Sequence, residues 1–514
     1  MQCIQSSSPR AAKGLSSPAS TMAPSESCAS LDMLPEQARV RALDRYVDAP
    51  VDLLRRFPYL GDPTEAAQAK RVDLIRGRVI VFVCAGNYDD KKHLYVHMLR
   101  EYGVRSVIIE ASDNSLVEWL LANKYIEGYV EVDMTPRASI TRECIEGIVG
   151  WCQNTGWRIS GVCTLWDDAV GLAARVANAF GVDHLSTLAV DIAHDKSRTR
   201  SFLESNRLPC PRNYTITTAD ELTQAAEVVG LPAILKPAVG NASVGVTKVS
   251  SAEDLQVKYE ELMGILDVTY QDGDFMGFTF EDVEDTARHS CELRNVLLES
   301  IMDGPEVDVD FVMSEGRVAY CNIVDDWPYE EPYYIELGNN CPTNLSQEDA
   351  ARLKMAATDI VTTMGCYSGI LHVEMKLTSA GPMLIEVNPR LGGGAIPYFH
   401  RNIYGVDLLL EQCLAAAGIP CNPPVSYSGL VGVSLHFFAP KSGVVEVADA
   451  ALAAESNANI GFCSLGVRAG DRVICWSDGF PPHVGRVDLI ADSFEKAVAQ
   501  CRDVERLLVW QIKE

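Results

Sequence analysis

Short apolar runs alternate with amphipathic stretches of helical length over residues 78–190. Strands are predicted at 79–84, 106–110, 128–132 and 161–165, helices at 93–102 and 169–180, and a turn at Gly86-Asn87. Apolar runs that alternate with helices are typical of βαβ units. This part of the chain is therefore predicted to form an open, mostly parallel α/β sheet.

The hydrophobic rhythm changes after Ala193. Apolar residues at 307, 309, 311 and 313 alternate with Asp308 and Asp310, which predicts antiparallel sheet with one covered face. The last segment, 426–514, mixes short strands at 431–437, 472–476 and 485–490 with a helix at 493–508. This mixture predicts a small α+β cap at the C-terminal end.

A chain of 514 residues is too long for one hydrophobic core, so roughly two to four domains are expected. Residues 1–24 are rich in Ser, Ala and Pro, which predicts a disordered tail, with a transit peptide as the alternative. The predicted division is a tail at 1–40, an N-terminal α/β domain at 41–190, a third unit at 191–425 and the cap at 426–514.

Two apolar segments, 369–377 and 382–390, predict a β-hairpin. Folding it about Ala380 places Glu374 opposite Glu386, because the numbers of residues paired across a turn sum to a constant. Asn388 lies on the same polar face as Glu386. Two opposed carboxylates need a cation between them, and carboxylate and amide oxygens suit Mg²⁺. A solvated polar face with Lys376 as counter-ion is the alternative.

A strand at 233–235 leads into Lys236 and then into a loop of small residues. The loop contains Gly240, Ser243 and Gly245. Such a loop lets backbone N-H groups approach phosphate oxygens closely, while the lysine adds positive charge. By itself the pattern also fits an ordinary mobile loop.

Further polar residues flank this loop in the sequence. Lys196 precedes it by about forty residues, and Leu297-Leu298 lead into Glu299 after it. Glu299 at a strand end is a candidate acceptor for an adenine amino group, and Glu306 is a candidate for ribose hydroxyls. Taken singly, each acid also fits a solvated surface position.

In this order the motifs resemble the ATP-grasp superfamily, over about residues 78–420. Within it, the chain is most similar to carnosine synthases and bacterial L-amino acid ligases. The motifs that carry this similarity are Trp166-Asp-Asp168, Lys196-Ser-Arg-Thr199, Glu336-Leu-Gly338, Pro342-Thr343 and the run from Glu386 to Gly394.

The resemblance implies an ATP-grasp fold for 191–425 and an ATP- and magnesium-dependent ligase. Such a ligase activates a carboxylate as an acyl phosphate and joins it to an amine, here two amino acids, releasing ADP and phosphate. The implied roles are ATP phosphates for Lys196 and Lys236, adenine for Glu299 and the Ile301 backbone, ribose for Glu306, and magnesium for Glu374, Glu386 and Asn388. Arg390 is then placed to stabilise the γ-phosphate and the tetrahedral oxyanion; its alternative role is a salt bridge to a metal-site carboxylate.

The formal net charge is -26, from 70 acidic and 44 basic residues. Such a field disfavours nucleic acid and anionic membranes as partners, and no stretch approaches the roughly 20 apolar residues of a membrane span. The 16 cysteines form no CxxC pair, which favours reduced thiols and a cytoplasmic protein without structural zinc. Small amino acid substrates are the expected partners, and a homodimer is left open.

The acidic and aromatic segment from Asp325 through Glu331 to Glu336 suggests a pocket for a cationic amine or an imidazole. A solvated loop is an equal alternative. Two other functions are also left open: another carbon-nitrogen ligase or a carboxylase on the same scaffold, and a nucleotide-binding regulator without turnover. The full set of Glu374, Glu386, Asn388 and Arg390 argues against the regulator.

Overall fold

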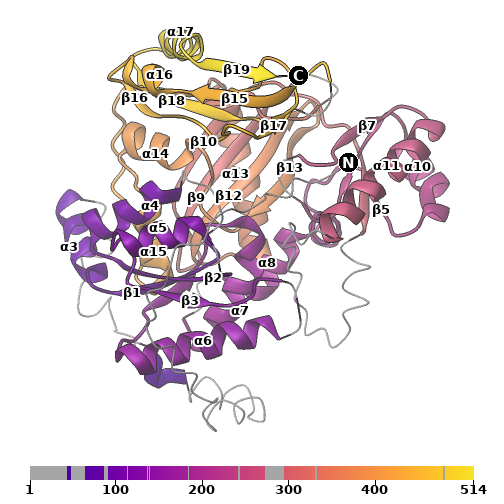
Figure 1. Ribbon diagram of the computed structural model, residues 1–514. Helices are drawn as coiled ribbons and strands as arrows, with labels where there is room; N and C mark the ends of the chain where they lie inside the picture. Colours follow the sequence, from indigo (N-terminus) through magenta and orange to yellow (C-terminus); the bar gives the residue numbers. More distant parts are fainter. Residues whose placement is uncertain are drawn as a thin grey trace.

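The computed structural model describes residues 43–47, 64–85, 91–112, 114–135, 137, 139–182, 185–240, 243–271, 294–329, 333–478 and 481–513 (Figure 1). The predicted tail at 1–40, the turn at Gly86-Asn87 and the acids Glu330 and Glu331 lie outside these residues. The same holds for two residues of the small-residue loop, Asn241 and Ala242.

The N-terminal region is built on a parallel sheet in the order β3-β2-β1-β4, which confirms the predicted open α/β sheet. Its strands are β1 (Val79–Val83), β2 (Arg105–Glu110), β3 (Gly128–Glu131) and β4 (Gly161–Cys163). All five residues of β1 are buried. Continuous burial is expected because helices cover both faces of a parallel sheet.

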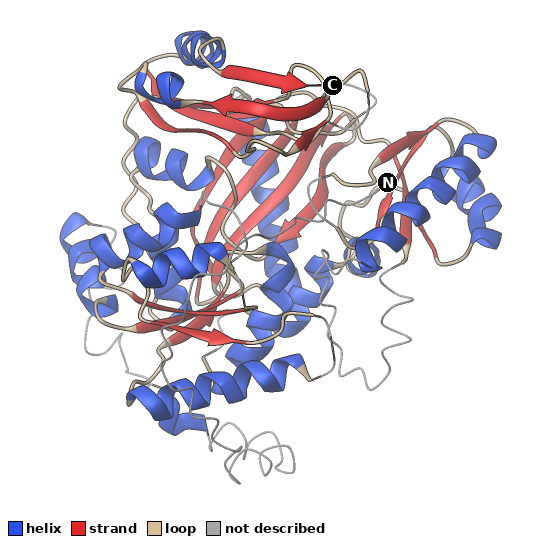
Figure 2. Cartoon of the chain, viewed as in Figure 1, coloured by secondary structure: helices blue, strands red, loops and turns tan. Residues whose placement is uncertain are grey.

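The helices of this region connect the strands and cover them (Figure 2). They are α3 (Glu65–Ile75), α4 (Lys92–His97), the π-helical turn η4 (Met98–Tyr102), α5 (Ser115–Ala122), α6 (Ile140–Thr155) and α7 (Val170–Phe180), with short turns at η1 (Asp44–Tyr46) and η5 (Asp167–Ala169). Next come α8 (Thr187–His194) and α9 (Lys196–Ser205). The predicted helices at 93–102 and 169–180 are confirmed, the first by α4 with η4 and the second by α7.

The centre of the molecule is one antiparallel sheet in the order β13-β12-β9-β10-β11-β14-β18-β16. Its strands are β9 (Glu306–Ser314), β10 (Arg317–Asp326), β11 (Gly338–Cys341), β12 (Gly369–Thr378), β13 (Gly381–Asn388), β14 (Val431–Phe437), β16 (Ile460–Leu465) and β18 (Gly485–Ala491). Val307, Val309 and Phe311 lie in a core together with residues of helix α13 (Gln347–Met364), as the alternation predicts.

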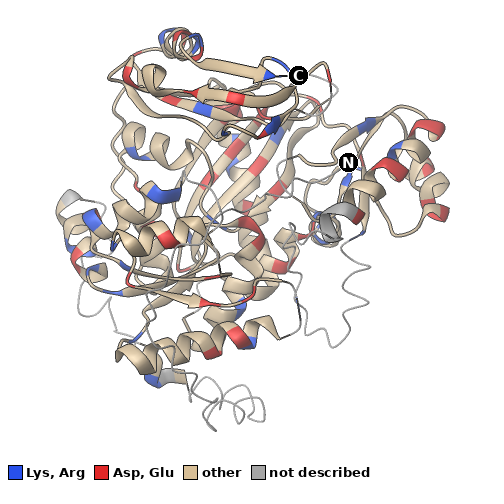
Figure 3. Cartoon of the chain, viewed as in Figure 1, with Lys and Arg blue, Asp and Glu red and all other residues tan. Residues whose placement is uncertain are grey.

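The expectation of only one covered face is wrong for part of this sheet. Val312, Tyr320 and Val324 belong to a second core that includes residues of α14 (Ile396–Tyr404) and α15 (Leu408–Ala416). These apolar and aromatic side chains lie on the second face of the sheet, and α14 and α15 bury that part of the face. Asp308 and Asp310 of β9 share this face with Val312, because residues two apart along a strand point to the same side. Figure 3 marks the acidic positions on the central strands in red.

The C-terminal segment extends the central sheet, because β14 pairs with β11. A smaller sheet, β17-β15-β19, and two helices lie beside it. These elements are β15 (Gly443–Asp449), β17 (Arg472–Val473), β19 (Val509–Lys513), α16 (Ala451–Glu455) and α17 (Phe494–Glu505). Strands on both sides of residue 425 share one sheet. The predicted division into domains, including the boundary at 425/426, stays a prediction.

A small lobe holds the fourth sheet, β5-β8-β6-β7, with helices α10 and α11 packed on it (Figure 1). Its elements are β5 (Asn213–Ile216), β6 (Ala233–Pro237), β7 (Thr247–Val249), β8 (Val296–Ser300), η6 (Ala219–Glu221), α10 (Leu222–Val229) and α11 (Ala252–Gln271). The chain crosses from this lobe to the central sheet between β8 and β9.

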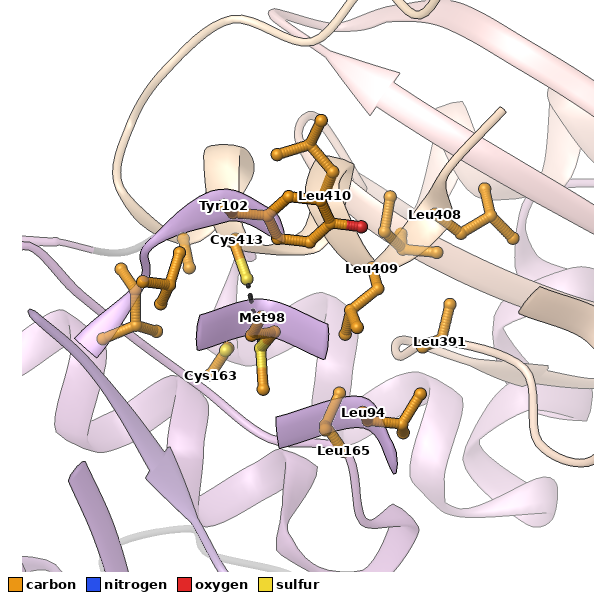
Figure 4. Packing of buried hydrophobic residues seen from close by; sticks show 14 of the residues in the cluster. Leu94, Met98, Tyr102, Cys163, Leu165, Leu391, Leu408, Leu409, Leu410 and Cys413 are labelled. Carbon is orange, nitrogen blue, oxygen red and sulfur yellow. Dashed lines mark hydrogen bonds between the residues drawn. The ribbon is translucent and has the colours of Figure 1, made fainter. Parts of the chain in front are cut away.

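A tightly packed seam joins the N-terminal sheet to helix α15 (Figure 4). Met98 of η4 and Cys413 of α15 approach to 3.5 Å between their sulfur atoms. A Cβ atom added at Gly161 in β4 would lie 2.1 Å from the backbone oxygen of Ala416. Only glycine therefore permits this approach. No helix in the described part of the chain is both long and apolar enough to cross a bilayer.

We predict that Gly161→Ala lowers the thermal unfolding midpoint, because its methyl group must push α15 away from β4 at a cost of about 1–3 kcal/mol. The matched control is Gly150→Ala in α6, where an added Cβ meets no atom within 4 Å. That variant should raise stability by about 0.5–1 kcal/mol, the usual gain from alanine in a helix. Circular dichroism on both variants measures the difference; equal midpoints would contradict the proposed steric role of the seam.

Candidate functional site

The hairpin of β12 and β13 has the predicted register, with Glu374 directly opposite Glu386. His372 pairs with Asn388 in the same register, and a bulge follows between Glu374 and Met375. Leu371, Val373 and Met375 are buried on the face that α13 covers. The predicted alternation is thereby confirmed, and both glutamates lie on the polar face.

A third carboxylate extends this pair across the sheet. β9 lies on the other side of β12, and its register places Asp308 opposite Glu374. Asp308, Glu374 and Glu386 therefore form a row across three neighbouring strands, which we call the carboxylate row. Side chains directly opposite each other on adjacent strands have Cβ atoms about 5 Å apart, so like charges there repel. Asp308 was not among the predicted site residues.

Charge in the carboxylate row is balanced unevenly. Lys196 Nζ lies 2.6 Å from Glu386 Oε2. Burial opposes the ionisation of Glu386, but this lysine outweighs it and holds the pKa of Glu386 well below its usual range. Burial, followed by the charges of Glu386 and Asp308, raises the pKa of Glu374 well above its usual value. Burial likewise raises the pKa of Asp308 to about 7, against the pull of His372. A cation between these oxygens would favour their ionised forms.

Asn388 bridges the two glutamates through its amide nitrogen. Nδ2 donates to Glu374 Oε1 at 3.3 Å and to Glu386 Oε1 at 3.1 Å. A metal ligand here must be the amide oxygen, because the NH₂ group has no lone pair to offer. Metal binding by Asn388 thus requires the amide to turn over, which exchanges its nitrogen and oxygen.

Lys196 also connects the carboxylate row to the small-residue loop. It is the first residue of α9, whose N-terminus is capped by Asp195. Its Nζ donates to the backbone oxygen of Gly240 at 2.7 Å. The loop then turns through Ser243 and Gly245, which have φ angles of 56° and 77°. Positive φ angles favour glycine and small polar residues, so the small side chains suit this turn between β6 and β7.

Glu299 of the small lobe lies in a buried ion cluster that also contains Arg200 of α9. Its Oε1 pairs with Lys236 Nζ, and its Oε2 accepts from Arg200 Nη2 at 2.9 Å. Burial opposes ionisation of Glu299, but the two cations outweigh it and lower its pKa to about 2. Burial also lowers the pKa of Lys236, with Arg200 adding to the effect against the attraction of Glu299. Both oxygens of Glu299 are engaged by cations, and its adenine role stays a prediction.

Ile301 and Glu306 lie where the chain passes from the sheet of the small lobe to the central sheet. Ile301 follows β8 and is 39 % exposed, whereas Glu306 begins β9. Lys376 Nζ lies 3.4 Å from Glu306 Oε2, in line with the register that pairs these two residues. Burial raises the pKa of Glu306. Ile301 is thus solvent-accessible between β8 and β9, and its backbone contact with adenine stays a prediction.

Arg390 contacts Asp167 of η5 in the N-terminal region rather than a carboxylate of the row. Its Nη2 lies 2.7 Å from Asp167 Oδ2, and its Nη1 donates to the backbone oxygen of Leu391 at 3.0 Å. Asp167 lies within the motif Trp166-Asp-Asp168, but no role was predicted for it. A cavity at this junction is lined by residues that include Asp167, Lys196, Gly240, Glu386 and Asn388.

Asp325 and Glu336, at the two ends of the acidic segment, have different surroundings. Asp325 accepts from the backbone N-H of Asn344 at 2.6 Å and from Asn340 Nδ2 at 3.2 Å, so it holds the chain after β11. Glu336 accepts from Asn339 Nδ2 at 2.7 Å and helps to raise the pKa of Asp308, which places it near the carboxylate row. The pocket hypothesis stays a prediction, with Asp325 engaged by its own neighbours and Glu336 near the carboxylate row.

Comparison with known proteins adds the following similarities. Residues 229–397 match the model of an ATP-grasp domain. The chain is 28% identical over 375 residues to carnosine synthase 1 of Homo sapiens, covering 70% of this chain and 42% of that protein. It is 26% identical over 263 residues to the D-alanine–D-alanine ligase of Ralstonia nicotianae, covering 48% of this chain and 71% of that one.

Solved structures share the overall architecture. The L-amino acid ligase from Bacillus licheniformis superimposes with a TM-score of 0.71 at 17% identity, over 85% of this chain and 100% of that one. The biotin carboxylase of Campylobacter jejuni superimposes with a TM-score of 0.61 at 16% identity, over 86% and 93% of the two chains. The predicted ATP-grasp fold and the resemblance to these ligases are thereby confirmed. The chain spans less than half the length of the human carnosine synthase it matches.

We predict that Glu299→Gln destabilises the protein by roughly 3 kcal/mol or more at neutral pH, because it leaves Lys236 and Arg200 buried without a counter-charge. The folded-state pKa of Glu299, about 2, lies below its usual value of 4.5. Ionised Glu299 therefore stabilises the fold fully above about pH 4.5 and progressively less as the pH falls toward 2.

Urea unfolding of the wild type and Glu299→Gln at a series of pH values measures this difference. The gap between their midpoints should be widest near neutral pH and shrink as the medium becomes more acidic than about pH 4.5. Glu505→Gln, on the exposed side of α17, is the control and should show no gap. A gap that widens on acidification would show that Glu299 is not held ionised.

Proposed function

We propose that this ATP-grasp chain is an ATP-dependent ligase that joins the carboxylate of one amino acid to the amine of another through an acyl phosphate, releasing ADP and phosphate. The observation that carries the proposal is the pair of opposed glutamates, Glu374 and Glu386, with Lys196 at 2.6 Å from one of them. Similarity to carnosine synthase and to D-alanine–D-alanine ligases supports amide-bond formation between amino acids.

Glu374, Glu386 and Asn388 would hold magnesium. Their carboxylate and amide oxygens are the hard ligands that Mg²⁺ prefers, and the raised pKa of Glu374 fits a site short of positive charge. Bound magnesium supplies charge neutralisation for phosphoryl transfer. Lys196 adds a fixed charge beside the same oxygens.

The nucleotide would lie between the small lobe and the central sheet. Adenine would contact the Ile301 backbone and Glu299, ribose would contact Glu306, and the phosphates would meet Lys196, Lys236 and the loop with Gly240, Ser243 and Gly245. The two lysines pair with Glu386 and Glu299 in the protein alone. Phosphate oxygens would compete for the same ammonium groups, which links nucleotide binding to these ion pairs.

Arg390 is the residue proposed to act on the reacting atoms. Burial opposes its charge, but Asp167, followed by Glu386 and Glu374, raises its pKa, so it stays a cation. A guanidinium has five N-H donors, and the described contacts with Asp167 and Leu391 use two of them. The remaining donors are available to a γ-phosphate or a tetrahedral oxyanion.

We also propose that the enzyme works in the cytoplasm on small-molecule amino acids. All cysteines of the described residues are free thiols, which supports a reducing compartment. Similarity to biotin carboxylase structures at 16% identity extends to the fold alone and does not favour a carboxylase.

We predict that the protein releases ADP and phosphate from ATP and Mg²⁺ only when a suitable pair of amino acids is present. The measurement is a screen of amino acid pairs, including β-alanine with histidine, with the product mass recorded. A dipeptide mass with ADP and phosphate is the expected result. AMP with pyrophosphate would rule out an acyl phosphate, and ATP binding without turnover for any pair would favour a regulator.

We predict that Arg390→Met lowers kcat by about 100- to 1000-fold, the usual loss when a donor to a transition-state anion is removed. The affinity for ATP, measured by calorimetry, should change only a few-fold, because the proposed contact of Arg390 with the γ-phosphate strengthens mainly as charge develops in the transition state. Arg502→Met, at an exposed position on α17, is the control and should leave kcat unchanged. A loss of ATP affinity that matches the loss of kcat would assign Arg390 to nucleotide binding instead.

A further inference from the structure

A histidine lies beside the carboxylate row, and nothing in the proposed reaction uses it. His372 precedes Glu374 by two residues on β12, so both side chains share the polar face. His372 Nδ1 lies 2.9 Å from Asp310 Oδ1. Asp310 is fully buried, and its other oxygen lies 2.9 Å from His400 Nε2. The orientation of the His372 ring is therefore fixed by a carboxylate that is itself held in place.

The glycine run after Arg390 closes over this histidine. A Cβ atom added at Gly392 would lie 2.9 Å from His372 Nδ1 and 3.1 Å from Asp310 Oδ1. The backbone of Gly392 thus packs directly against the contact between the imidazole and the carboxylate. This packing leaves the other ring nitrogen, Nε2, to face the carboxylate row.

His372 Nε2 lies 3.6 Å from Asp308 Oδ1, which is too far for a good hydrogen bond. Within the described part of the chain, Asp308 makes no side-chain hydrogen bond, although it is only 6% exposed. One ligand atom each from Asp308, His372 and Glu374 lie within 4.8 Å of one another. Two carboxylate oxygens and one imidazole nitrogen therefore converge on one small volume.

We propose that Asp308, His372 and Glu374 form a second divalent-cation site, suited to a transition-metal ion such as Mn²⁺. It is distinct from the site proposed for Glu374, Glu386 and Asn388, and the two share Glu374. Magnesium prefers oxygen ligands, whereas an imidazole ligand suits ions such as Fe²⁺ or Zn²⁺. Mn²⁺ suits the two carboxylates of this set, and it is the paramagnetic ion used as the probe.

The contacts around His372 support this assignment. Histidines that ligate metals usually donate their other ring N-H to a carboxylate, which fixes the tautomer and aims the free nitrogen at the ion. Asp310 is in the position of that outer carboxylate. A cation between Asp308 and Glu374 would also offset the repulsion expected of two carboxylates directly opposite each other on adjacent strands. The alternative is an imidazolium between Asp308 and Asp310, with no metal.

The test is electron spin-echo envelope modulation on Mn²⁺ added to the chelator-treated full-length protein without nucleotide. The expected spectrum shows coupling of the bound Mn²⁺ to an imidazole nitrogen-14. His372→Gln should abolish this coupling, and Asn388→Ala should leave it intact because Asn388 belongs only to the other site. His97→Gln is the matched control and should leave the coupling intact. His97 also lies near a carboxylate, at 3.3 Å from Asp407 Oδ2, but neither residue belongs to the proposed site.

Asp310→Asn separates a positioning role from ligation. It should weaken Mn²⁺ binding about 10- to 100-fold while the nitrogen coupling of the bound ion remains, as expected for an outer-shell partner. Bound Mn²⁺ without nitrogen coupling in the wild type, coupling that persists in His372→Gln, or no Mn²⁺ binding would each overturn the proposal. These readouts need no turnover, so they are separate from the outcome of the ligase assay.

Discussion

The structure depends on holding several buried carboxylates close together at one end of the central sheet. Asp308, Glu374 and Glu386 come from three strands, and their register is fixed by the opposite face, where apolar side chains pack under α13. A one-residue slip would move these acids into that apolar core, so the hydrophobic pattern that builds the sheet also places the acids. The resulting repulsion must be met by cations.

Those cations are supplied by distant parts of the chain. Lys196 reaches the row from the start of α9, and it also holds the small-residue loop through the Gly240 oxygen. Arg390 follows the last strand of the hairpin, but it is held by Asp167 of the N-terminal region. The seam at Gly161 keeps the N-terminal sheet close to α15. Gly161 lies six residues before Asp167 in the sequence. The site is therefore complete only when the N-terminal sheet, α9 and the hairpin are packed together.

Sequence reasoning reached what depends on local pattern. The parallel strands, the hairpin and the pairing of Glu374 with Glu386 follow from alternation and from one short turn. The pairing of β9 with β12 does not follow, because β10 and β11 lie between them in the chain, and so Asp308 was missed. The contact of Arg390 with Asp167 joins residues that are 223 positions apart in the chain, which no periodicity encodes. For the same reason the continuation of the central sheet into β14 could not be seen from the segment at 426–514.

Two buried groups of charged side chains differ in how completely the protein itself balances the charge of their carboxylates. Glu299 is bound by two cations, Lys236 and Arg200, so its charge is more than balanced within the protein. The carboxylate row has three acids with Lys196 at one end and His372 at the other, and Glu374 in the middle has the least favourable environment for its charge. A fold selected only for stability has little reason to keep such an imbalance, because unpaired buried charge is costly. The deficit of positive charge around Glu374 is therefore best explained by cations and ligands that the protein binds from solution.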